Sequence, residues 1–98
     1  MDRARAALSK LVEGNETTAG MAVRTHGANL ILAREEEAES GETVPSDRVR
    51  LTKIGPNTWG LSVKRHTGRW EQTPFTGDMK TVVEAIRTFM QHLVAPYR

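Results

Sequence analysis

Six basic side chains in the second half of the chain are the residues whose types and spacing could do chemistry. They are Arg48, Arg50, Lys64, Arg65, His66 and Arg69. Basic residues at alternate positions of a β-strand share one face, where they can neutralise successive phosphates of a nucleic acid. Single-strand binders usually add aromatic side chains on which bases stack. Alternation puts Trp59 and Trp70 on the opposite face, so a solvated sheet face is the simpler interpretation of these cations.

No other set of residues predicts a reaction. The three histidines, His26, His66 and His92, have no spacing typical of metal ligands, and Glu35–Glu37 lies in a segment too irregular for a paired-carboxylate site. Phosphate-binding loops and nucleophile motifs are absent from the sequence. We therefore expect no catalytic residue, no metal and no cofactor, and we do not expect an enzyme.

Charge is distributed unevenly along the chain. The whole chain has a net charge of +2. Residues 34–43 contain five glutamates and one arginine, whereas residues 44–98 contain nine Lys or Arg and four acidic residues. Residues 35–47 also contain glycine and proline and few apolar side chains, which predicts a mobile solvent loop. Within it we expect residues 41–46 to be disordered, because ordering a backbone costs about 1–2 kcal/mol per residue.

Two strands of a hairpin follow this loop. Residues 48–53 and 58–64 both alternate apolar and polar side chains, and Gly55-Pro56-Asn57 supplies a turn. A three-residue loop sets Leu51 opposite Leu61 and Val49 opposite Val63, which keeps the apolar set on one face. The same register sets Arg48 opposite Lys64 on the outer face.

A second hairpin turns at residues 66–68 and returns through residues 69–73. Either a two-residue or a four-residue loop puts Trp70 on the inner face with Val63. The outer partner of Lys64 is Glu71 with the shorter loop and Arg69 with the longer one, and the sequence leaves this choice open.

A long amphipathic helix is expected from Met79 to Val94, capped by Thr76 or Asp78 and ended by Pro96. Its apolar stripe needs the inner face of the sheet, since neither surface can be buried alone. The side chains that we expect to be buried between them are Trp59, Leu61, Val63, Val83, Ile86 and Phe89. Trp70 and Phe75 are expected to add to this core.

The first third of the chain predicts a short helix over residues 2–12 and two strands, 21–25 and 29–34, although residues 29–39 also favour a helix. The fold class is thus α+β: an antiparallel β-meander of about five strands with a short N-terminal helix and a long C-terminal helix packed on one sheet face. Residues 1–98 are expected to form one small domain.

Cysteines are absent, and neither a signal peptide nor a run of membrane-spanning length occurs. We expect a bacterial-type cytoplasmic protein without a membrane partner. The favoured function is a non-catalytic binding or accessory domain that acts through a protein partner or as a homodimer. The alternative is single-stranded nucleic-acid binding by the basic outer face.

Overall fold

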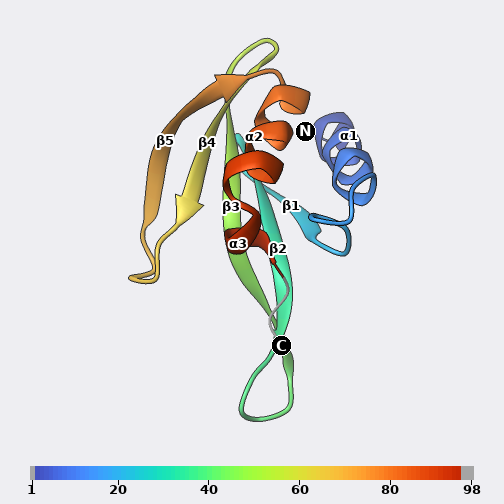
Figure 1. Ribbon diagram of the computed structural model, residues 1–98, viewed down its shortest axis with the longest axis vertical. Coiled ribbons are helices and arrows are strands. Elements are labelled where there is room, and N and C mark those ends of the chain that lie inside the picture. The colour runs from blue at the N-terminus through green and yellow to red at the C-terminus, as the bar shows by residue number, and fades with distance from the viewer. Residues whose placement is uncertain (1, 96–98) are drawn as a thin grey trace.

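The structure is a computed structural model, which describes residues 2–95. Along the chain a helix precedes five strands, and two helices follow them (Figure 1). The elements are α1 (Asp2–Glu13), β1 (Ala22–His26), β2 (Asn29–Glu37), β3 (Thr43–Gly55), β4 (Thr58–Lys64), β5 (Trp70–Gly77), α2 (Met79–Phe89) and α3 (Gln91–Val94).

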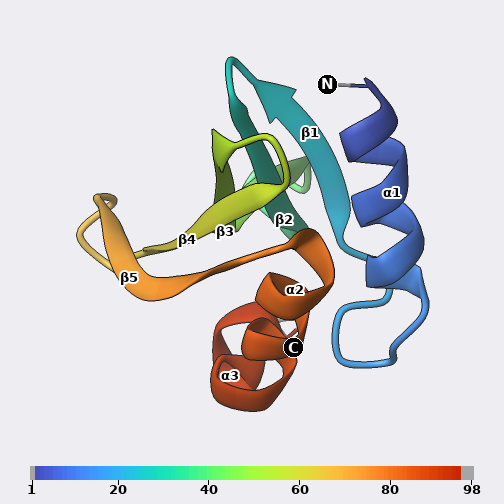
Figure 2. The same ribbon diagram turned by 90° about the horizontal axis from the view of Figure 1, so that it is seen from above.

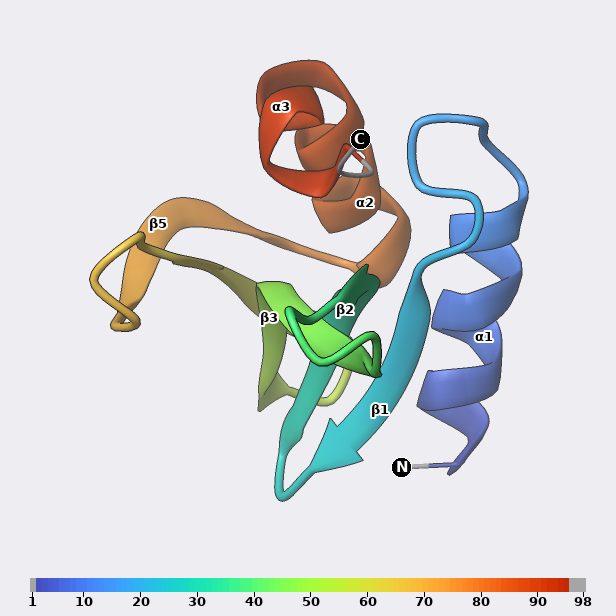
Figure 3. The ribbon, with the colours of Figure 1, turned by 90° about the horizontal axis from the view of Figure 1, so that it is seen from below.

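The five strands form one antiparallel sheet in the order β1-β2-β3-β4-β5, so each strand pairs with its neighbour in sequence. Figures 2 and 3 show the three helices on one side of this twisted sheet, with α1 along β1 and α2 across β4 and β5. The opposite side carries no helix, and we call it the open face. The predicted α+β class, five-stranded sheet and N-terminal helix are confirmed. None of the helices described here is long and apolar enough to cross a membrane.

The core lies between the sheet and the helices. Leu30, Leu32, Val49, Leu51 and Leu61 are fully buried in it from the strands. From the helices it takes Leu8, Val12, Val82, Val83, Ile86 and Val94. Together these side chains make one apolar cluster, as burial of two amphipathic surfaces requires.

The register between β3 and β4 is confirmed. Val49 lies opposite Val63 and Leu51 opposite Leu61. The turn itself differs from the prediction, because Gly55 pairs with Thr58 and the register shifts between Lys53 and Gly55. Ile54 is the extra residue at this bulge and is 58% exposed. The bulge preserves the apolar pairing although the loop is shorter.

The β4–β5 hairpin overturns the predicted position of Trp70. The amide of Arg65 donates to the carbonyl of Arg69, so the loop is His66–Gly68, with Gly68 at a φ of 87°. This loop of three residues is neither the two-residue nor the four-residue loop of the prediction, and it sets Trp70 opposite Lys64. A shift of one residue moves a side chain to the other face. Trp70 therefore lies on the open face, and neither Glu71 nor Arg69 is the partner of Lys64.

The C-terminal helix is shorter than predicted. Asp78 caps α2 by accepting a hydrogen bond from the Thr81 amide, but α2 ends at Phe89, and Met90 separates it from α3. Phe89 is 63% exposed and stacks on Phe75, so the expected burial of Phe89 is wrong. The expected burial of Trp59, Leu61, Val63, Val83 and Ile86 is confirmed. Pro96 lies outside the described residues.

Residues 35–47 are not an irregular loop. Glu35, Glu36 and Glu37 pair with Pro45, Val44 and Thr43, so β2 and β3 extend into a long hairpin. Its turn spans residues 38–42, and the Ala38 amide donates to the Glu42 carbonyl. The helical alternative for residues 29–39 is thus wrong. Of residues 41–46, which were expected to be disordered, residues 43–46 are paired in β3. The mobility of residues 35–47 stays a prediction.

Candidate functional site

The open face is built from side chains that the strand register aligns in rows. One row crosses all five strands as Arg24, Ile31, Arg50, Ser62 and Gln72. A second row contains Asn29, Thr52, Gly60 and Thr76, and in it the Thr52 hydroxyl donates to Asn29 Oδ1. Apart from Ile31 these side chains are polar or absent, which is typical of a sheet surface without a covering layer.

Trp70 is the aromatic side chain of the open face, and two cations flank it. The guanidinium carbon of Arg50 lies 4.8 Å from the centre of the Trp70 ring, and Lys64 Nζ lies 5.1 Å from it. Arg50 comes from β3 and Trp70 from β5, and the small Ser62 of β4 stands between their strands. Each contact is within cation–π distance. Cations and an aromatic ring therefore share one surface, whereas the alternation of residue types predicts them on opposite faces.

Next to this cluster the open face is hollowed. Arg50, Thr52, Ile54 and Gln72 line the hollow together with Gly60 and Ser62. Arg50 Nε is buried and has no hydrogen-bond partner among residues 2–95. A buried donor without an acceptor carries a free-energy penalty of about 1–3 kcal/mol. The hollow itself is lined by the polar side chains of Thr52, Ser62 and Gln72, which can form hydrogen bonds with a ligand.

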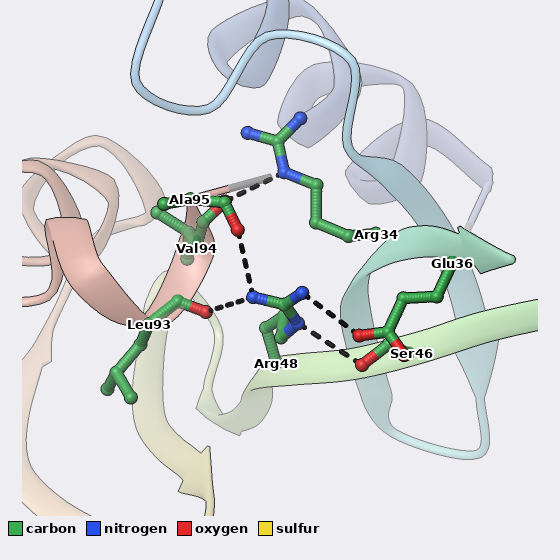
Figure 4. A network of polar contacts seen from close by, with 7 residues as sticks. All are labelled: Arg34, Glu36, Ser46, Arg48, Leu93, Val94 and Ala95. Atoms are coloured by element: carbon green, nitrogen blue, oxygen red, sulfur yellow. Dashed lines mark hydrogen bonds and ion pairs between the residues drawn. The ribbon is translucent and has the colours of Figure 1, made fainter. Parts of the chain in front are cut away.

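Arg48, which the sequence placed beside Arg50, is not on the open face. The β2–β3 register shifts between Leu32 and Ala33, so Arg48 is an extra residue without a ladder partner. Its side chain turns to the helix side and is 8% exposed. There Arg48 Nη1 donates to the carbonyls of Leu93 and Ala95 (Figure 4).

Arg34, which the sequence analysis did not single out, has the same role as Arg48. Its guanidinium donates to the carbonyls of Val94, Ala19 and Thr17. Burial lowers the pKa of Arg34, and the like charge of Arg48 lowers it further. Two buried guanidiniums therefore hold the end of α3, where carbonyls lack helical partners. Alternation with Leu30 and Leu32 was the sequence signal for the inner position of Arg34. No such signal existed for Arg48, because the bulge reverses its side.

The remaining predicted residues, Arg65, His66 and Arg69, lie exposed at the β4–β5 turn. Arg65 Nη1 is 3.4 Å from Glu71 Oε1, and both side chains are more than half exposed, so this ion pair is weak. His66 faces a cleft that also contains Lys64 and, from α3, His92. The spacing of His92 from Lys64 and His66 along the sequence did not predict that they lie close together. Proximity of α3 to the turn comes from tertiary packing alone.

Arg24 of β1 is also a cation of the open face, but it is paired. Its two terminal nitrogens donate to the two carboxylate oxygens of Asp47. These hydrogen bonds lower the pKa of Asp47, and the charges of Arg24 and Lys64 add to the effect. The unpaired basic character of the open face is therefore concentrated at Arg50 and Lys64.

Residues 2–95 contain no group of three or more histidine, aspartate or glutamate side chains placed to hold a metal ion. Compared with protein-family models, with curated proteins and with solved structures, the chain matches none. The site must therefore be interpreted from its own geometry.

Proposed function

We propose that this protein binds single-stranded nucleic acid on the open face of its sheet. The observation that carries the proposal is the position of Trp70, on the uncovered side and in contact with both Arg50 and Lys64. An aromatic ring offers a stacking surface to any unpaired base, and the flanking cations neutralise backbone phosphates. These are the two components that single-strand binders combine.

The hollow beside Trp70 adds a polar component. Thr52, Ser62 and Gln72 supply hydrogen-bond donors and acceptors to the hollow. Base edges are accessible to such groups in single strands, where the bases are not engaged in pairing. The open face therefore favours a single strand over a duplex.

Fluorescence anisotropy with labelled single-stranded DNA and RNA tests the proposal. For single strands, two phosphate contacts through Arg50 and Lys64 predict a slope of log affinity against log salt of about −1.4. Arg50→Glu and Lys64→Glu should each weaken binding, whereas Lys80→Glu on α2, away from the open face, should leave affinity unchanged. Absence of binding to both DNA and RNA at low salt would exclude the proposal.

A second candidate, a protein-binding accessory domain that acts as a homodimer or with a protein partner, is favoured by a different observation. Phe89 is 63% exposed, and its ring lies 5.3 Å from that of Phe75. Ile54 is the other large apolar side chain that is more than half exposed among the described residues. Light scattering on the wild type and on Phe89→Ser tests the homodimer: a dimer that dissociates on substitution supports it, and a wild-type monomer argues against it.

A further inference from the structure

A cleft lies where the β4–β5 turn, the bulge of β3 and α3 meet. It has a volume of about 340 Å³, at the small end of the roughly 300–1,000 Å³ that is typical of small-molecule sites. Its charged and titratable lining residues are Asp47, Arg48, Lys64, Arg65, His66 and His92. These residues come from three separate segments of the chain.

The cleft contains more basic than acidic groups. Asp47 is its one lining carboxylate among the described residues, and both oxygens of Asp47 already accept hydrogen bonds from Arg24. Lys64, Arg65 and the two histidines surround the opening, and Arg65 has only the weak, exposed ion pair with Glu71. The opening of the cleft therefore combines two permanent cations, Lys64 and Arg65, with one carboxylate that is engaged elsewhere.

Behind the opening, Arg48 adds a buried positive charge. It donates to the carbonyls of Leu93 and Ala95, which are uncharged, and it forms an ion pair with Glu36 Oε1 at 3.3 Å. Arg34 lies close enough for the charge of Arg48 to disfavour its protonated form.

We propose that this cleft binds the phosphate group of a phosphate monoester. A dianion matches several converging cations better than a carboxylate, which carries one charge, and arginine and lysine together are common phosphate ligands. Lys64 from β4 and His92 from α3 contact the ligand from two different elements. The inference goes beyond the proposed function, because the cleft shares Lys64 with the open face but does not use Trp70.

Heteronuclear NMR titration with inorganic phosphate tests the site, with acetate at equal ionic strength as the control. Saturable shifts should be confined to residues 46–48, 64–66 and 92–95. Loss of one charge-assisted hydrogen bond in Lys64→Ala or His92→Ala should weaken phosphate binding about tenfold. Lys80→Ala should bind as the wild type does. Arg48 is not substituted, because its removal would disturb the fold.

Trp70→Ala separates this inference from the proposed function, since it should lose oligonucleotide binding and retain phosphate binding. A second comparison identifies the source of the phosphate. Tighter binding of a 5′-phosphorylated oligonucleotide than of its 5′-hydroxyl form supports a strand end, and equal binding of the two supports a free phosphorylated molecule. Shifts of equal size with acetate, or wild-type phosphate affinity in both Lys64→Ala and His92→Ala, would overturn the inference.

Discussion

Arg48 and Arg50 are two residues apart on β3, yet their side chains lie on opposite sides of the sheet. Arg50 contacts the Trp70 ring on the open face, whereas Arg48 donates to the carbonyls of Leu93 and Ala95 among the helices. The bulge between Asp47 and Val49 is the cause, because one extra residue reverses the alternation. Arg48 thereby holds the end of α3, whereas Arg50 belongs to the face on which we propose binding.

This relationship predicts different effects of the same substitution. Arg48→Leu leaves two carbonyls at the end of α3 without their donor and should lower the free energy of unfolding by roughly 2–4 kcal/mol. Arg50→Leu should change it by less than about 1 kcal/mol, as is usual for surface positions. Urea unfolding followed by circular dichroism measures both. Equal losses in the two variants would contradict the assignment.

Substitution of the two tryptophans should also have different effects, one on stability and the other on binding. Trp59 is 4% exposed within the core, so Trp59→Ala should cost about 3–5 kcal/mol of stability. Trp70→Ala should preserve the fold but reduce single-strand affinity by about 1–3 kcal/mol for a stacked base. Thermal unfolding and anisotropy on the same samples provide the comparison. Undiminished oligonucleotide binding by Trp70→Ala would remove Trp70 from the site.

The Arg24–Asp47 pair predicts a pH dependence of stability. Hydrogen bonds from Arg24 hold the pKa of Asp47 below its ordinary value, which is about 3.9 for aspartate in an unfolded chain. Because the folded pKa is the lower one, the contribution is fully present above the unfolded value and is lost as pH falls through the folded value. We expect the free energy of unfolding to decrease below about pH 5.

Asp47→Asn should reduce the loss of unfolding free energy at acidic pH, and Arg24→Gln should reduce it by the same amount. The double variant should behave like either single one, since both substitutions remove one interaction. Denaturant unfolding at a series of pH values gives the three curves. Unchanged acid sensitivity in Asp47→Asn would show that the pair does not contribute.

Neighbouring apolar positions of α2 give a fourth prediction. Ile86 is fully buried, and Ile86→Ala should destabilise the protein by about 2–5 kcal/mol. Phe89 is mostly exposed, and Phe89→Ala should cost no more than about 1.5 kcal/mol through loss of the stacked Phe75 pair. A loss at Phe89 as large as that at Ile86 would indicate that a second surface covers Phe89 in solution.

The pattern of apolar residues was sufficient for much of the fold. Val49, Leu51, Leu61 and Val63 could share one face in one register, and burial favours that register so strongly that a bulge at Ile54 accommodates the turn. The stripe of Val82, Val83 and Ile86 likewise required an apolar sheet face. Both predictions rest on hydrophobic burial, which depends on side-chain type and periodicity.

The candidate sites were decided by tertiary structure. The number of residues in the β4–β5 loop determined on which face Trp70 lies. The hydrophobic pattern does not distinguish loops that differ by one residue when the flanking residues are polar or amphipathic. The side of Arg48 was decided by acceptors at Leu93, 45 residues further along the chain. A guanidinium can be solvated on the surface or bonded to buried carbonyls. Local sequence determines its charge, but the packing of α3 against β3 determines which of these environments it occupies.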